Sequence, residues 1–333
     1  MQLSFNGKTV AALGLCLLSP IIAEYLLGDW TLRQLSSLSF LIPLYGVGAL
    51  LIREFSRYHQ LGWAGIVSLS IAFGLIEEGL LTQSFFNADY YHAGLISYAY
   101  VDALGTSFFW VVFVLGLHSL GSICLPILMT EIFTCEALRK KVWFGKGLFF
   151  LFLTIYILGA LSIYIGTQAA FSYQSSVMQK TSVLIAAGLF VVLPFFYKRR
   201  KAKAGYSTPS PVCVFFIIFS ICSYFFAQHY LKVEFIFGEY FVIFSMLLSY
   251  ILGFYLIFRW CSNYRWREAH QLSICLSLLI IYSILGLYQF SKGKTGLGFS
   301  VSSLDMVLQF ALILAILCPV IIKLIHYSKN NTC

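Results

Sequence analysis

The chain has 333 residues, of which 60% are hydrophobic and only 11% are charged, and its mean hydropathy is +0.86. Soluble domains carry about 25% charged residues, so this composition excludes a soluble globular protein. The net charge of +9 does not indicate nucleic-acid binding, because the basic residues stand in short segments between long apolar runs. The runs are long enough to cross a bilayer, which predicts an all-α, polytopic transmembrane bundle of about ten helices in a cell membrane.

The first apolar run, about residues 9–28, is predicted to be a retained helix. It follows Lys8 as a signal peptide would, but it is about twenty residues long and has no small-x-small cleavage site. It contains Glu24, a weaker candidate for a functional carboxylate. The second predicted helix, about 36–55, ends in Arg53-Glu54. We expect this pair at the membrane interface; alternatively, Arg53 reaches inward as a counter-ion.

The third predicted helix, about 62–86, contains two adjacent carboxylates, Glu77 and Glu78, inside an apolar run. Ionisable residues within a membrane are costly and are rarely kept without a partner or a function. Thr82 lies four residues after Glu78 and shares its face, and Gln83 follows. Adjacent carboxylates suit general acid–base chemistry. The structural alternative is a carboxylate that pairs with arginine or histidine to hold two helices together.

A polar loop, about 87–102, precedes the fourth predicted helix. The apolar run from Ala103 to Phe133 is longer than the roughly twenty residues needed to cross a membrane. Gly121 and Pro126 interrupt it, so the sequence predicts a bend or a break on the cytoplasmic side of this helix.

His118 is predicted to lie at the membrane depth of Glu77 and Glu78. It stands about fifteen residues into its helix, or roughly 22 Å by helical rise, and consecutive helices run in opposite directions. We therefore expect His118 to contact one of the two carboxylates, directly or through one water. Ser122 shares the face of His118, and Glu131, near the end of the run, is a weaker candidate.

The rest of the chain alternates basic loops and apolar runs. A basic loop at 134–146 is followed by six predicted helices at about 147–166, 182–197, 212–230, 240–259, 272–290 and 306–326. The basic, Pro- and Ser-containing linker 198–211 separates a predicted N-terminal half, 1–197, from a C-terminal half, 212–333. The N-terminal half carries the glutamate–histidine site.

The distribution of basic residues predicts the orientation in the membrane. Of the 22 Lys and Arg residues, 17 lie in one alternate set of loops and 5 in the other. Cytoplasmic loops are the ones enriched in Lys and Arg, so both termini are predicted to be cytoplasmic.

Neither the cysteines nor the common motifs indicate a cofactor. The nine cysteines form no CxxC pair, so neither a disulfide framework nor a cysteine zinc cluster is predicted. The sequence has no phosphate loop, no GxSxG and no HExxH motif. Whether the glutamate–histidine site uses a metal stays open at this point.

The pair Glu77-Glu78, followed by His118 in the next helix, resembles the CPBP family of CAAX-processing and bacteriocin-processing intramembrane proteases and related immunity proteins. That family's pattern is EExxxR, then FxxxH, then HxxxN or HxxxD. Here Thr82 stands at the arginine position, Val114 stands at the phenylalanine position, and the last motif is missing. The resemblance implies an all-helical membrane fold in which a glutamate and histidine activate water to hydrolyse a membrane peptide.

Three functions stay open on the sequence. The first is an intramembrane hydrolase, metal-independent or metal-assisted, with Glu77 or Glu78 as base and His118 as partner. The second is a proton- or cation-coupled transporter in which the same carboxylates carry the ion. The third is an immunity or scaffold protein without catalysis. The expected partners are the lipid bilayer and, for a hydrolase, a membrane-embedded peptide or protein; nucleic acid is not expected.

Overall fold

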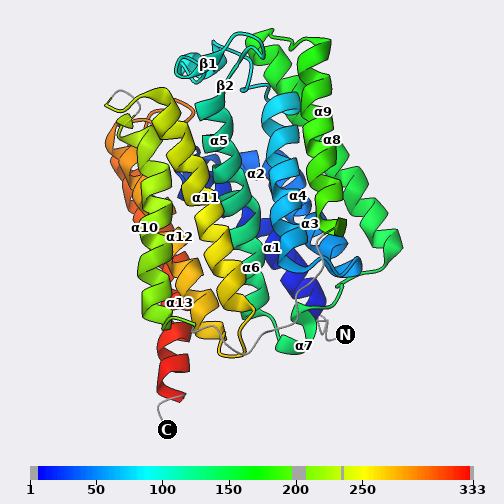
Figure 1. Cartoon of the computed structure of the whole chain (residues 1–333), viewed down its shortest axis with the longest axis vertical. Helices are drawn as coiled ribbons and strands as arrows, with labels where there is room; N and C mark the ends of the chain where they lie inside the picture. Colours follow the sequence, from blue (N-terminus) through cyan, green and yellow to red (C-terminus); the bar gives the residue numbers. More distant parts are fainter. Residues whose placement is uncertain (1–6, 197–207, 234–235, 331–333) are drawn as a thin grey trace. The chain divides into compact units, whose positions relative to one another are not determined.

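The computed structural model describes residues 7–196, 208–233 and 236–330 (Figure 1). The chain forms two compact units, one made of residues 1–23 and 35–197, the other of residues 24–34 and 198–333. Residues 24–34 therefore belong with the C-terminal part of the chain. Most of the predicted linker 198–211 lies outside the described residues, and Pro211 begins a helix.

The predicted all-α membrane bundle is confirmed. The described residues contain ten helices that are long and apolar enough to cross a membrane. These spans are Gly7–Leu26, Leu32–Tyr58, Gly62–Leu81, Phe108–Phe133, Lys146–Phe171, Val177–Phe196, Pro211–Tyr230, Glu239–Cys261, Glu268–Ser291 and Ser303–Tyr327. Each follows from an apolar run of about twenty residues or more, in which a helix satisfies its own backbone groups.

The first unit contains most of the first two spans and all of the next four, several of them built from more than one helical segment. Its regular helices are α1 (Gly7–Pro20), α2 (Leu38–Leu41), α3 (Val47–Tyr58), α4 (Gly62–Ile76), α5 (Phe108–Leu117), α6 (Leu125–Phe133), α7 (Glu136–Arg139), α8 (Lys146–Phe171) and α9 (Val177–Phe196). Helix α4 packs against α3 and α9. The short helix α7 lies at one end of the long helices of this unit, and a small hairpin lies at the other (Figure 1).

Four stretches of the spans are π-helical rather than α-helical. They are η1 (Ile21–Leu26), η3 (Ile42–Gly46), η4 (Glu77–Leu81) and η6 (His118–Cys124). A π-helical turn closes its hydrogen bonds over five residues instead of four, which inserts one residue and turns the following side chains to a new direction. Such turns are rare in proteins as a whole, and those that occur frequently lie at functional sites.

The fourth span, for which a bend or a break was predicted, is not broken. The span is helical from Phe108 to Phe133, and the π-helical η6, which contains Gly121, takes the place of a break. Pro126, which has no backbone N–H to donate, lies just after η6 in the first turn of α6.

The same span begins later than predicted, at Phe108 rather than at Ala103. The preceding residues form an antiparallel hairpin of β1 (Tyr100–Val101) and β2 (Thr106–Ser107). Ser107 then caps the helix, because its hydroxyl accepts a hydrogen bond from the backbone N–H of Trp110 at 3.1 Å. The polar loop before the hairpin contains a single 3-10 turn, η5 (Tyr90–His92).

The second unit contains four spans and the segment 24–34. Its helices are α10 (Pro211–Tyr230), α11 (Glu239–Cys261), α12 (Glu268–Ser291) and α13 (Ser303–Asn330), and the 3-10 helix η2 (Leu32–Ser37) begins in its segment 24–34. Helix α12 is the central one, since it packs against both α10 and α13. The segment is tied to α13 by a two-pronged ion pair of Arg33 with Asp305, with N–O distances of 2.7 and 2.6 Å.

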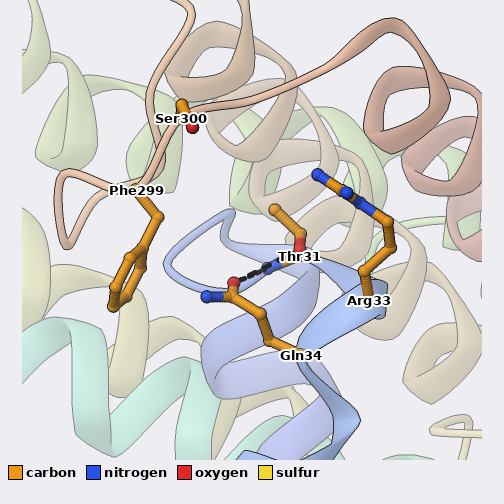
Figure 2. A pocket seen from close by; sticks show the side chains of 5 residues that line it. All are labelled: Thr31, Arg33, Gln34, Phe299 and Ser300. Carbon is orange, nitrogen blue, oxygen red and sulfur yellow. Dashed lines mark hydrogen bonds between the residues drawn. The ribbon is translucent and has the colours of Figure 1, made fainter.

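A small pocket lies beside this ion pair, within the second unit. Figure 2 shows its lining by Thr31, Arg33, Gln34, Phe299 and Ser300. The Gln34 side chain accepts hydrogen bonds from the backbone N–H and the hydroxyl of Thr31, at 3.1 and 3.2 Å. Because Arg33 already pairs with Asp305, its charge is neutralised within the fold.

Candidate functional site

Glu77, Glu78 and His118 meet in the interior of the first unit. Their exposed fractions are 2%, 7% and 5%. His118 Nε2 lies 2.8 Å from Glu78 Oε1, and His118 Nδ1 lies 3.2 Å from Glu77 Oε2. The predicted contact of His118 with the glutamate pair is therefore confirmed, and the imidazole touches both carboxylates rather than one. We call these three residues the triad.

Irregular backbone brings the two adjacent glutamates to one imidazole. Neighbouring residues of an α-helix point about 100° apart, so both would not normally reach the same partner. Glu77 and Glu78 lie in η4, and His118 opens η6. Gly74 allows the two spans to approach closely, because a Cβ there would lie 3.1 Å from Leu115 and 3.4 Å from the His118 Cβ.

Two hydroxyl groups donate hydrogen bonds to Oε2 of Glu78, the carboxylate oxygen that does not face His118. Thr82 donates to Glu78 Oε2 at 3.0 Å, as its shared face with Glu78 predicted. The Ser84 hydroxyl donates to the same oxygen, and the indole N–H of Trp110 donates to Ser84 at 3.0 Å. Oε1 of Glu78 is left facing His118. Ser84 and Trp110 were not predicted from the sequence.

Tyr45 holds Glu77. Its hydroxyl donates to Glu77 Oε1, and its ring stacks on the His118 imidazole with 6.0 Å between centroids and 14° between planes. Tyr45 comes from η3, so three π-helical segments contribute to the site. The sequence offered little signal for it, since Tyr45 is one of 21 tyrosines in an aromatic-rich chain.

Ser122 completes the surroundings of the imidazole. Its hydroxyl lies 3.2 Å from His118 Nδ1, in agreement with the predicted shared face. Its backbone carbonyl accepts a hydrogen bond from Ser19 of α1 at 2.6 Å. The first span is thereby joined to the segment that carries His118.

Arg53 and Glu131 form a cluster of their own. Arg53 is fully buried and pairs with Glu54 and, at 3.0 Å, with Glu131. Arg57 binds the second oxygen of Glu131 at 2.5 Å. The sequence predicted Arg53-Glu54 as a pair at the membrane interface, with Arg53 as an inward-reaching counter-ion as the alternative. Both side chains are buried within the protein, and Arg53 is also a counter-ion to Glu131. We call Arg53, Glu54, Arg57 and Glu131 the arginine cluster.

The remaining nitrogen of Arg53, Nη2, donates hydrogen bonds to backbone carbonyls in the connection after α6. Arg53 Nη2 donates to the carbonyls of Arg139, Lys141 and Leu138 at 2.8, 3.2 and 3.4 Å. The guanidinium also lies 3.3 Å above the ring centre of Trp143. Arg53 therefore fixes the connection that contains α7 and is committed to that role.

Gln83 and Glu24, the other two candidates, have different surroundings. Gln83 is buried, and its side-chain oxygen accepts from the backbone N–H and hydroxyl of Ser175, at 2.6 and 2.8 Å. It therefore fixes the connection between α8 and α9. Glu24 lies in η1, at the start of the second unit, so it is not part of the first unit's site.

The triad has the chemistry of a proton-handling or metal-binding centre. Each of its members offers one ligand atom, and these atoms lie within 4.8 Å of one another. Carboxylates and imidazole accept and donate protons, and they are also common ligands of zinc and related ions. Both uses fit a buried position between transmembrane helices.

Comparisons with curated proteins and with solved structures gave no match. A family model described as an uncharacterized membrane protein family matches residues 13–327, a range that contains the triad, its hydroxyl partners and the arginine cluster. The match is to this family and not to the CPBP family. Because the matched range covers nearly the whole sequence, the chain belongs to this uncharacterized membrane protein family.

Proposed function

We propose that the triad is the centre of an intramembrane hydrolase that cleaves a membrane-embedded peptide or protein with water. The observation that carries the proposal is the placement of one buried imidazole between two buried carboxylates, at 2.8 and 3.2 Å. The resemblance of Glu77-Glu78 and His118 to the CPBP proteases supports the same chemistry.

Peptide hydrolysis needs a group that removes a proton from water and a group that returns one to the leaving amine. Glu77, Glu78 and His118 supply these groups, either by taking the proton themselves or by holding a metal ion that polarises the water. Thr82, Ser84 and Tyr45 fix the carboxylates, and Ser122 fixes the imidazole. Such fixed geometry is what keeps reacting groups aligned.

The charge distribution supports an orientation with both termini in the cytoplasm of a cell. Under this proposal the basic connection with α7 and the arginine cluster lie at the cytoplasmic end of the first unit. The hairpin β1–β2 lies at its outer end. The triad lies inside the spans and is buried within the unit.

The test is hydrolysis by the reconstituted full-length chain. Proteoliposomes would be incubated with a panel of single-span peptides in H₂¹⁸O, and products would be analysed by mass spectrometry. Hydrolysis places ¹⁸O in the new carboxyl terminus. Glu78→Gln and His118→Ala are expected to reduce product at least about 100-fold, the lower range for loss of acid–base catalysis.

The matched control is Glu136→Gln, since Glu136 is exposed on α7 and outside the site. It should cleave like the unchanged chain. Cleavage that persists in Glu78→Gln and His118→Ala, or its absence from the unchanged chain across the panel, would contradict the proposal.

Ion-coupled transport is the second candidate, favoured by the three ligand atoms within 4.8 Å of one another. Buried carboxylates within transmembrane helices commonly mark ion pathways. Transport predicts uptake into proteoliposomes that depends on a proton or sodium gradient and disappears in Glu78→Gln. Hydrolysis predicts ¹⁸O-labelled products whether or not a gradient is present.

A further inference from the structure

We infer that Glu77, Glu78 and His118 bind one divalent transition-metal ion of the zinc class. The three residues offer two carboxylate oxygens and one imidazole nitrogen, a ligand set that zinc accepts at about 2.0–2.2 Å. All three are buried in the first unit, and their ligand atoms lie within 4.8 Å of one another. Binding of one ion requires side-chain rotations that bring these atoms closer together.

The carboxylates are arranged as metal ligands are. Glu77 Oε1 accepts from Tyr45, and Glu78 Oε2 accepts from Thr82 and Ser84. Each carboxylate is thus anchored through its outer oxygen and presents its other oxygen, Glu77 Oε2 or Glu78 Oε1, to the imidazole. Ligating carboxylates are typically held in this way by outer hydrogen bonds, which orient them and tune the ion.

The imidazole follows the same rule. Nδ1 of His118 lies 3.2 Å from both the Ser122 hydroxyl and Glu77 Oε2, and Nε2 lies 2.8 Å from Glu78 Oε1. A metal-bound histidine commonly uses one ring nitrogen for the ion and the other for an outer hydrogen bond. We therefore assign Nε2 to the ion and Ser122 to Nδ1 as its outer partner. Glu77 Oε2, which lies beside Nδ1, must then turn toward Nε2 to reach the ion.

Charge balance favours a divalent ion. Two ionised carboxylates beside a neutral imidazole carry a formal charge of −2, and like charges this close in a buried site repel each other. A divalent cation brings the sum to zero. The imidazole ligand favours zinc or another transition metal over Mg²⁺, which prefers oxygen ligands and keeps its waters.

Three protein ligands leave one position of a tetrahedral zinc ion open. Catalytic zinc sites have this arrangement, with water in the fourth position, whereas structural sites use four protein ligands. The assignment of that position to the attacking water rests on the proposed function. Metal binding itself does not, and it is tested without any measurement of activity.

The experiment measures zinc on the purified full-length chain in detergent. After incubation with Zn²⁺ and removal of unbound ion, mass spectrometry of the metal is expected to give about one zinc per chain. X-ray absorption at the zinc edge should show nitrogen and oxygen neighbours with an imidazole signature. Neighbouring sulfur would place the ion on cysteines and overturn the proposal, as would zinc below about 0.1 per chain.

Variants assign the ion to the triad. Glu78→Gln and His118→Ala should lower zinc affinity at least about 100-fold, and Tyr45→Phe, which removes only an outer hydrogen bond, about 10–100-fold. The matched controls Glu136→Gln and His92→Ala change exposed residues and should bind like the unchanged chain. Unchanged affinity in Tyr45→Phe and in the folded ligand variants would overturn the assignment.

Failure of this inference and failure of the proposed function give different results. A chain that binds one zinc through the triad but cleaves no peptide contradicts only hydrolysis. A chain that cleaves the peptide but binds no zinc contradicts only the metal site.

Discussion

Tyr45 has two contacts at the site that can be separated by mutation. Its hydroxyl donates to Glu77, and its ring stacks on His118. Replacing the hydroxyl with hydrogen keeps the ring contact and leaves a buried carboxylate oxygen without that donor. The energetic cost of such a loss exceeds the net value of the hydrogen bond itself, because a buried acceptor that loses its donor keeps its desolvation penalty.

Tyr45→Phe is accordingly expected to lower the free energy of unfolding by about 1–3 kcal/mol. The measurement is reversible denaturant unfolding of the full-length chain in mixed micelles. Tyr240→Phe is the matched control, because Tyr240 is 90% exposed, and it should stay within about 0.5 kcal/mol of the unchanged chain. Equal stability of the two variants would show that the Tyr45 hydroxyl has no such role.

Arg53 is the residue on which the arginine cluster depends. Replacing it with leucine leaves Glu54 and Glu131 buried without this guanidinium, a change that typically costs about 3–5 kcal/mol. Arg53→Leu should therefore destabilise the chain by that amount in the same unfolding measurement. The exposed Arg265, changed to leucine, is the control and should change stability little. If the Arg53→Leu chain were as stable as the unchanged chain, the result would contradict the buried network.

At the scale of residues, sequence could predict the charged members of the site but not the neutral ones. Glu77, Glu78 and His118 stand out because ionisable groups are rare in apolar runs. Tyr45 and Ser84 do not, since tyrosine and serine are common in membrane helices. Arg53 was considered for two roles, and only the contacts with Glu131 and the carbonyls after α6 distinguish them.

At the scale of elements, the apolar runs predicted the ten spans, but the hydrogen-bond pattern inside them was not predictable. At least one π-helical segment, η3, packs closely against another span. Gly46, the last residue of η3, shows this, because a Cβ there would lie 2.1 Å from the carbonyl oxygen of Cys16 in α1. The late start of the fourth span at Phe108 likewise depends on the pairing of β1 with β2.

Gly46→Ala should therefore destabilise the first unit, because backbone of α1 must move away to accept one methyl group. Gly188 of α9 offers a matched control, since nothing lies within 4 Å of a Cβ built there. Gly188→Ala should be neutral or stabilising by up to about 1 kcal/mol, the helical preference of alanine over glycine. The measurement is the thermal unfolding temperature of the two variants. A Gly46→Ala chain that is as stable as the Gly188→Ala chain would contradict the close approach of α1 and η3.

At the scale of the whole molecule, the first unit has mostly buried spans, which carry the polar site, and mostly exposed spans. The spans that carry the triad are mostly buried, whereas α8 and α9 expose most of their apolar residues. Apolar side chains on those two helices are expected to face lipid, which explains why long runs there carry few polar groups. The polar site is thus enclosed by the unit and not by the membrane itself.

The orientation of the first unit can be tested by labelling from outside. Helix α7 and the hairpin β1–β2 lie at opposite ends of the unit (Figure 1). Cys135, next to α7 in the sequence, is exposed, and the Asp89 side chain, in the loop that precedes the hairpin, is 79% exposed. Two chains are needed, one that keeps Cys135 as its single cysteine and one whose single cysteine is Asp89→Cys. Because the basic connection after α6 is predicted to be cytoplasmic, a membrane-impermeant maleimide should label intact cells only when they carry the Asp89→Cys chain.

Cys135 should react only after the membrane is opened, and that reaction also serves as the control for its reactivity. The reverse pattern would invert the orientation, and labelling of both chains in intact cells would contradict their placement on opposite sides of the membrane.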